Sequence, residues 1–171
     1  MQTRGRREVF TSLFGKKDAE KNQDKLCVRP PYHKEGVDFS KACLSCQGNP
    51  CVGACEEEIM VLDATNVPYL DFSKGGCTFC EACANACEEN VLTLTCNETK
   101  ALDVKVTIDV LACMAWHQSL CQSCLDACDV RAITFLGLFR PQINATICNG
   151  CGMCVSICPS SAMRVYTKEE R

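Results

Sequence analysis

The chain of 171 residues has few of the residue types that stand-alone enzymes and membrane proteins depend on. It holds two histidines and one tryptophan, and it contains neither a glycine-rich dinucleotide turn nor a phosphate-binding loop. No stretch approaches the ~18 consecutive apolar residues of a membrane-spanning helix. These absences argue against an enzyme and against a membrane span. Because aromatic residues are also few, the conventional core is thin and needs a staple such as a metal cluster.

The N-terminus carries an arginine pair, Arg6-Arg7, but lacks the rest of an export signal. A secretory or twin-arginine peptide continues with an apolar stretch of about 7–15 residues. Here Lys16 and Lys17 follow soon after the pair, and charged residues recur as far as Lys25. We therefore expect a cytoplasmic protein, in a compartment where thiols stay reduced.

Cysteine is the residue that the chain has in excess, with 18 in all. Sixteen of them fall into four groups, and the second and fourth groups read C-x2-C-x2-C-x3-C, which is typical of ferredoxins that bind [4Fe–4S] clusters. The first group reads C-x2-C-x4-C-x3-C and the third C-x7-C-x2-C-x3-C, so each still supplies four thiolates. The groups are Cys43, Cys46, Cys51 and Cys55; Cys77, Cys80, Cys83 and Cys87; Cys113, Cys121, Cys124 and Cys128; and Cys148, Cys151, Cys154 and Cys158.

Two other uses of cysteine suit this spacing less well. Zinc sites usually place two ligands together and two well apart, whereas the regular groups here place three thiolates within seven residues. A disulfide scaffold is expected in secreted chains, and cysteines this crowded could not pair locally with good geometry. The sequence therefore predicts four [4Fe–4S] clusters, whose binding would be part of the folding free energy.

The fourth cysteine of each group is expected to bind the cluster of another group. It follows on a short helical turn and points away from the loop of the first three, as in two-cluster ferredoxins. Nested pairing, first group with fourth and second with third, stays open, although sequential elements more often neighbour each other. With sequential pairing the four ligand sets are Cys43, Cys46, Cys51 and Cys87; Cys77, Cys80, Cys83 and Cys55; Cys113, Cys121, Cys124 and Cys158; and Cys148, Cys151, Cys154 and Cys128.

The groups form a fourfold repeat, because their first cysteines stand at positions 43, 77, 113 and 148. After a turn, each group leads into an apolar, partly β-branched segment, which predicts strands within 55–62, 87–94, 128–135 and 158–165. Further strands are expected before most groups, over 68–72, 103–108 and 142–144. The predicted fold is α+β: tandem ferredoxin-like (βαβ)2 domains over 36–98 and 99–171, each holding two [4Fe–4S] clusters.

Residues 1–35 lie outside the repeat and are expected to form a basic arm, extended or disordered. Residues 1–25 hold seven Lys and Arg against four Asp and Glu, although the whole chain has a net charge of −3. Each bound cluster with its four thiolates would add about −2 to the acidic remainder, which argues against nucleic-acid binding. The segment Arg29-Pro30-Pro31-Tyr32 resists helix and ladder pairing and should be extended.

Four further residues are candidates for smaller roles. Trp116 lies in the long loop of the third group and is expected to cover that cluster as an apolar lid. His117 beside it could ligate iron, but four cysteines make this unnecessary. Cys27 and Cys96 fall outside every group and are expected to be free thiols.

Together these features resemble the NapF family, the ferredoxin-type accessory proteins of the bacterial periplasmic nitrate reductase system. The resemblance covers nearly the whole chain. It rests on the four cysteine groups, the x7 loop of the third group, the arginine pair without an apolar continuation, the segment 29–32, and Pro141-Gln142 leading into 148–152. The first group departs from C-x2-C-x2-C-x3-C, the spacing that the family more often shows.

The resemblance implies a cytoplasmic, non-enzymatic protein that contacts the precursor of the catalytic nitrate reductase subunit before export. It would help that subunit to acquire its own cluster, by supplying cluster or electrons. The residues alone leave a second function open, that of a polyferredoxin carrying electrons to an anaerobic redox enzyme. The basic arm gives weak independent support to the first function, since a carrier that merely collides with its partner needs no tether.

Overall fold

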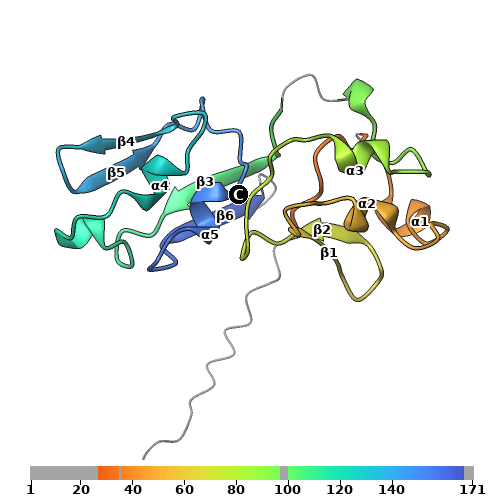
Figure 1. Ribbon diagram of the computed structural model, residues 1–171, viewed down its shortest axis with the longest axis horizontal. Helices are drawn as coiled ribbons and strands as arrows, with labels where there is room; N and C mark the ends of the chain where they lie inside the picture. The colour runs from red at the N-terminus through yellow and green to blue at the C-terminus, as the bar shows by residue number, and fades with distance from the viewer. Residues whose placement is uncertain (1–26, 35, 97–99, 168–171) are drawn as a thin grey trace, which may run out of the picture.

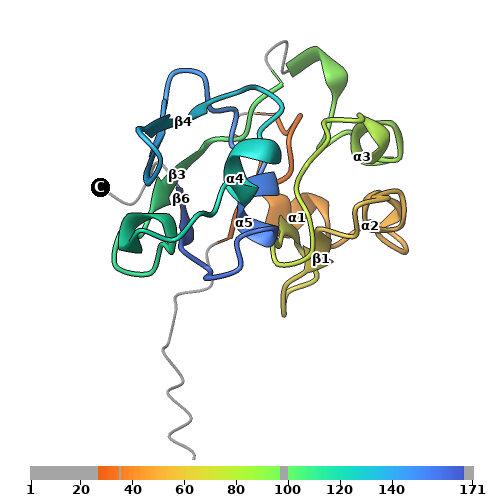
Figure 2. The same ribbon diagram turned by 60° about the vertical axis from the view of Figure 1, so that its left-hand side comes forward.

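The computed structural model describes residues 27–34, 36–96 and 100–167, which form two halves lying side by side in both views (Figure 1 and Figure 2). Secondary structure is mixed, with short helices and small two-stranded sheets. The first half contains α1 (Phe39–Ala42), α2 (Pro50–Gly53), β1 (Met60–Leu62), β2 (Pro68–Leu70), α3 (Ala82–Asn85) and the 3-10 helix η1 (Leu94–Cys96). The second half contains β3 (Val104–Ile108), the 3-10 helix η2 (Ala115–His117), α4 (Ser123–Asp126), β4 (Ile133–Leu136), β5 (Arg140–Ile143), α5 (Met153–Ser156) and β6 (Met163–Thr167).

The second half contains two antiparallel strand pairs, one between its two ends and one in its middle. β3 pairs antiparallel with β6, with Val106 opposite Val165, so the segment before the third group meets the segment after the fourth. β4 and β5 form the hairpin between them. Along β3, Val104 and Val106 are buried while Lys105 is exposed, which is the period of two expected for a strand with one face on the core. The strands predicted in this half are confirmed.

The first half follows a similar plan, in which the N-terminal segment 27–34 makes two isolated bridges in place of an outer strand. β1 and β2 form the hairpin, with Met60 opposite Leu70. Val28 bridges Leu70. His33 bridges Leu92, which follows the second group, and this bridge corresponds in position to the pairing of β3 with β6 in the other half. Residues 27–34, which the sequence placed with the arm outside the repeat, thus pack into the first half. Val28 and Tyr32 are only 3% and 2% exposed.

The strand expected after the second group, within 87–94, is wrong. Leu92 makes one isolated bridge, and the chain then turns into η1. Its partner segment contains Pro30 and Pro31, which have no backbone N–H to donate, and Tyr32 follows with a positive φ of 68°. The pairing is limited to Thr93 N–H donating to the Tyr32 carbonyl at 2.7 Å and Lys34 N–H donating to Val91 at 3.2 Å. For the same reason the segment 29–32 is extended only at its start and turns at Pro31 and Tyr32.

Each of the helices α2 to α5 is a single turn that carries the third cysteine of a group and ends just before the fourth. The third cysteines Cys51, Cys83, Cys124 and Cys154 are all buried. This is the short helical turn expected from the spacing. The additional helix α1 precedes the first group and is capped by Asp38, whose carboxylate accepts a 3.1 Å hydrogen bond from the Ser40 N–H.

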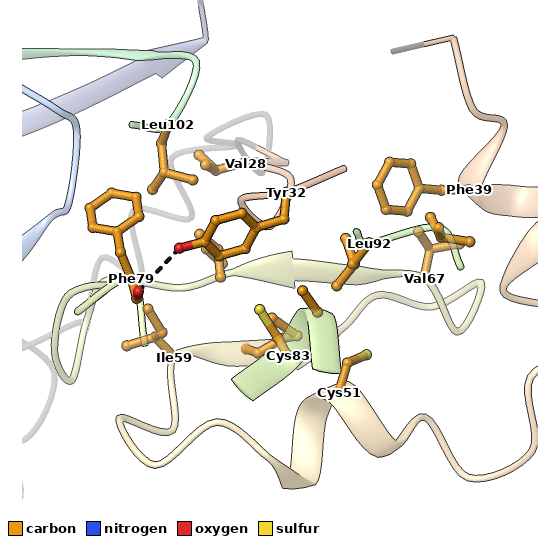
Figure 3. Close-up of a cluster of buried hydrophobic side chains, with 14 of the residues drawn as sticks. Val28, Tyr32, Phe39, Cys51, Ile59, Val67, Phe79, Cys83, Leu92 and Leu102 are labelled. Atoms are coloured by element: carbon orange, nitrogen blue, oxygen red, sulfur yellow. Dashed lines mark hydrogen bonds between the residues drawn. The ribbon is translucent and has the colours of Figure 1, made fainter. Parts of the chain in front are cut away.

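Figure 3 shows the core of the first half, in which Tyr32 and Leu92 lie above the short helices that bear Cys51 and Cys83. Two-stranded ribbons are marginally stable alone, so sheets this small depend on what packs against them. Buried cysteines supply much of that packing in both halves. Among the described residues, none of the helices is long and apolar enough to cross a membrane.

Candidate iron–sulfur sites

The structure brings the sixteen cysteines of the four groups into four sets, each drawn from two neighbouring groups. The first set lines one pocket of the first half, together with Phe39 and Leu92. Its fourth member comes from the second group, because the turn at α3 directs the end of that group back toward the first. The members of this set are Cys43, Cys46, Cys51 and Cys87.

The second set lines another pocket of the first half. Ile59 from the turn before β1 lies in its wall, and so does Tyr32 from the N-terminal segment. Its fourth member comes from the end of the first group, so the first two groups exchange their last cysteines. The members of this set are Cys77, Cys80, Cys83 and Cys55.

The second half contains the other two sets. Cys148, Cys151, Cys154 and Cys128 line a pocket with Ile133 and Ile143. Cys113, Cys121 and Cys158 pack together around Ala115 and Ala162. Cys124 lies in the adjoining buried cluster, against which Cys158 also packs, and it completes the last set. Its pKa is raised by burial and by the neighbouring thiols of Cys113, Cys121 and Cys158. Among the described cysteines, the grouping follows sequential pairing and not nested pairing.

Burial disfavours the thiolate form of these cysteines as long as no cation compensates the negative charge, and so it raises their pKa. It is the largest cause that raises the pKa of Cys51, Cys77 and Cys124 to about 11, and of Cys83 and Cys154 to about 12. Neighbouring thiols add to the shift in every case. Since metal ligands must be thiolates, loading these sets would release protons, and a cationic iron core would offset the repulsion.

The fourth cysteine of each group is called here its closing cysteine. Backbone N–H groups point at the sulfur of three of these four closing cysteines. Ala132 donates to the Sγ of Cys128 at 3.2 Å, and Ala162 donates to the Sγ of Cys158 at 3.2 Å. Leu92 donates to the Sγ of Cys87 at 3.5 Å. Burial raises the pKa of Cys158, but the N–H groups of Ala162 and Ser160 outweigh it, so that its pKa is lowered. Such hydrogen bonds stabilise a thiolate and tune a bound cluster.

Sequence reasoning missed these donors, although a signal for two of them was present. In the second half an alanine follows each closing cysteine by four residues, at Ala132 and Ala162, and both are fully buried. A small residue there lets the backbone come close to sulfur. Val91 occupies the matching position in the second group, and the donor shifts to Leu92.

The sets fit a cluster better than a single ion. A zinc ion needs four ligand atoms about 2.3 Å from one point. Among the described residues, no three His, Cys, Asp or Glu side chains converge in that way. A cubane has four iron corners that each take one thiolate, so its ligands stand around a core several atoms wide. Four cysteine sulfurs facing a shared pocket match that demand.

The structure also places the other candidates. Trp116 packs against the buried Cys113 set and lies below Arg140, whose guanidinium carbon is 5.9 Å from the ring centre. The indole Nε1 is buried and has no hydrogen-bond partner in the described part of the chain. The ring Nε2 of His117 lies 2.9 Å from the Leu111 carbonyl oxygen. Cys27 is half-buried outside the four sets, and the side chain of Cys96 lies outside the described residues.

Comparison with known proteins identifies similar chains along most of the length. A family described as a 4Fe-4S dicluster domain matches residues 119–162. The match starts after Cys113, where the x7 loop departs from the regular spacing. The ferredoxin-type protein NapF of Escherichia coli K12 is 37% identical over 140 residues, covering 80% of this chain and 82% of its own. The ferredoxin-type protein NapF of Haemophilus influenzae is 32% identical over 165 residues, covering 92% and 91%.

Proposed function

The chain belongs to the NapF family of ferredoxin-type proteins, and from that premise we propose that it assists maturation of the catalytic subunit of periplasmic nitrate reductase. It binds the precursor of that subunit in the cytoplasm, before export. There it supplies iron–sulfur cluster or electrons. It is an accessory protein and not an enzyme.

The observation that carries this proposal is the similarity to the ferredoxin-type NapF proteins along most of the chain. The gathering of sixteen thiols into four sets supports the cluster chemistry that the function needs. Each set holds one [4Fe–4S] cluster: Cys43, Cys46, Cys51 and Cys87; Cys77, Cys80, Cys83 and Cys55; Cys113, Cys121, Cys124 and Cys158; and Cys148, Cys151, Cys154 and Cys128. A bound cluster stores and passes one electron at a time. The protein side chains fix the four ligands, exclude water and donate hydrogen bonds to sulfur.

The two halves act as tandem ferredoxin-like domains, over residues 36–98 and 99–171, with residues 27–34 completing the first. Residues 1–25 supply an attachment that is separate from the cluster sets. Their surplus of basic residues suits an acidic partner surface, whereas the loaded body is strongly acidic. A polyferredoxin that only carries electrons is the competing function, and the close packing of the four sets would serve it equally.

The test uses the loaded chain and purified nitrate reductase catalytic subunit, in precursor and mature forms, without oxygen. We expect the chain to bind the precursor and to bind the mature subunit more weakly. With 57Fe-labelled chain and a cluster-free precursor, label that moves into the precursor indicates cluster supply. Label that stays behind while a loaded subunit becomes reduced indicates electron supply. No binding to either form, with rapid reduction of a different redox enzyme, would favour the carrier instead.

A further inference from the structure

The second and fourth cysteine groups meet where the two halves touch. The backbone N–H of Cys77 donates a 2.7 Å hydrogen bond to the carbonyl oxygen of Cys151. Both residues are the candidate ligands of their own sets, so the connection from one sulfur to the other runs through two cysteine backbones and one hydrogen bond. In Figure 1 the segment after β2 accordingly lies beside α5.

Two buried glycines allow this close approach. A Cβ on Gly76 would lie 2.7 Å from the Cys151 carbonyl oxygen and 2.8 Å from the Cα of Met153, which are backbone atoms that cannot turn aside. Gly152 faces the ring of Phe72, and a Cβ there would lie 2.6 Å from its Cγ. The backbones therefore pack against each other at a distance that only glycine permits.

Other contacts hold the junction in place. Leu102, from the segment that joins the halves, donates its N–H to the Asn149 carbonyl at 2.8 Å. Cys151 and Val155 of the fourth group pack against the buried core of the first half, which includes Phe72. The contact of the two groups is thus part of a continuous apolar interface.

Within each half, the sets adjoin through their buried helical cysteines. Cys51 and Cys83 belong to one cluster of buried residues in the first half. Cys124 and Cys154 belong to one such cluster in the second half. Among the described residues, the backbone hydrogen bond that joins cysteine groups of different halves links Cys77 of the second set to Cys151 of the fourth. Cys151 also packs against the buried core of the first half. The second and fourth sets thus lie at the junction, and the first and third sets are the outer ones.

We propose that electrons cross between the halves at the Cys77–Cys151 contact, so that the four centres form a relay in the order first, second, fourth, third. This rests on the proposed loading of the four sets. Each crossing oxidises one centre by one electron and reduces the other by one, with no bond made or broken and no proton moved. The two irregular groups, with the x4 and x7 loops, then stand at the ends where electrons enter and leave.

The test compares the full-length loaded protein with the variants Gly76→Ala and Gly75→Ala, reduced with dithionite. The control is matched, because a Cβ on Gly75 would meet its nearest atom at an ordinary 3.5 Å. Pulsed EPR measures the magnetic coupling between reduced centres, and iron analysis measures loading. We expect loading near sixteen irons in all three proteins, from four clusters of four. Coupling across the halves should be present in the parent and in Gly75→Ala and weaker in Gly76→Ala, because the added Cβ pushes the second and fourth groups apart.

Failure of the proposed loading and failure of the relay give different results. Low iron in the parent protein would contradict the proposed loading. Full iron with coupling confined to each half of the parent, or with coupling across the halves that Gly76→Ala leaves unchanged, would overturn the relay. If Gly76→Ala does not retain iron, the parent and Gly75→Ala decide: coupling across the halves supports the relay, and coupling confined to each half overturns it.

Discussion

The hydroxyl of Tyr32 donates a 3.1 Å hydrogen bond to the carbonyl oxygen of Phe79, between Cys77 and Cys80 (Figure 3). Both aromatic residues are at most 5% exposed. The N-terminal segment thus fixes the loop that supplies the second cysteine set. Phe79 has a positive φ of 55°, so this loop adopts a backbone conformation that needs such support.

Replacing Tyr32 by Phe should therefore loosen the second set. The variant leaves the buried Phe79 carbonyl without its partner, which costs about 1–3 kcal/mol. We expect faster loss of iron to a chelator under anaerobic conditions. Tyr166→Phe is the control, since Tyr166 is 43% exposed. Equal rates of iron loss in the two variants would show that the hydrogen bond does not hold the loop.

Two N-terminal truncations should separate attachment from folding. Removing residues 1–25 deletes the basic residues but leaves Val28 and Tyr32 in the core. Iron content should stay unchanged while binding to the reductase precursor weakens. Removing residues 1–34 also deletes both core residues and should reduce iron content. Loss of iron in the shorter truncation would show that residues 1–25 have a structural role.

Because the first two groups exchange their closing cysteines, replacing one of these cysteines should affect the cluster of the other group. Cys87 lines the pocket of Cys43, Cys46 and Cys51 and not that of its own group. Cys87→Ser should therefore perturb the EPR spectrum of the first cluster more than that of the second. Cys55→Ser should do the reverse. If each variant perturbs the cluster of its own group instead, cross-ligation is excluded.

The single tryptophan offers an optical report on the third set. Trp116 packs beside Cys113 and Cys121, so a cluster there should quench its fluorescence. Cys121→Ser, which removes a ligand of this set, should raise the emission several-fold. Cys80→Ser, which removes a ligand of the second set in the other half, should change it little. An equal rise in both would mean that Trp116 does not lie close to the third cluster.

The strands and the helical turns α4 and α5 of the second half could be predicted from the sequence. Its cysteine spacing fixes the helical turns at α4 and α5, and the D-V-K-V-T-I alternation at 103–108 gives β3. These signals are local, so they are readable without tertiary information. The same spacing in the first half indicated α2 and α3, but it left open whether the closing cysteines are exchanged sequentially or in the nested order.

Long-range features could not be predicted in this way. The segment 29–32 looks like a linker, yet Tyr32 is buried. The residue that accepts its hydrogen bond, Phe79, lies 47 residues further along the chain. Leu92 lies in an apolar, strand-like segment, yet prolines in its distant partner prevent a ladder. Gly76 resembles any loop glycine until Cys151 of the other half is placed against it. In each case a distant contact, and not local preference, decides the outcome.

The most direct test is the iron, acid-labile sulfide and zinc content of the full-length protein purified without oxygen, with an EPR spectrum after reduction. Four clusters held by four cysteine sets predict about sixteen irons and sixteen sulfides per chain, little zinc, and signals from interacting [4Fe–4S] centres. Four irons or fewer, together with stoichiometric zinc in a folded protein, would contradict the account.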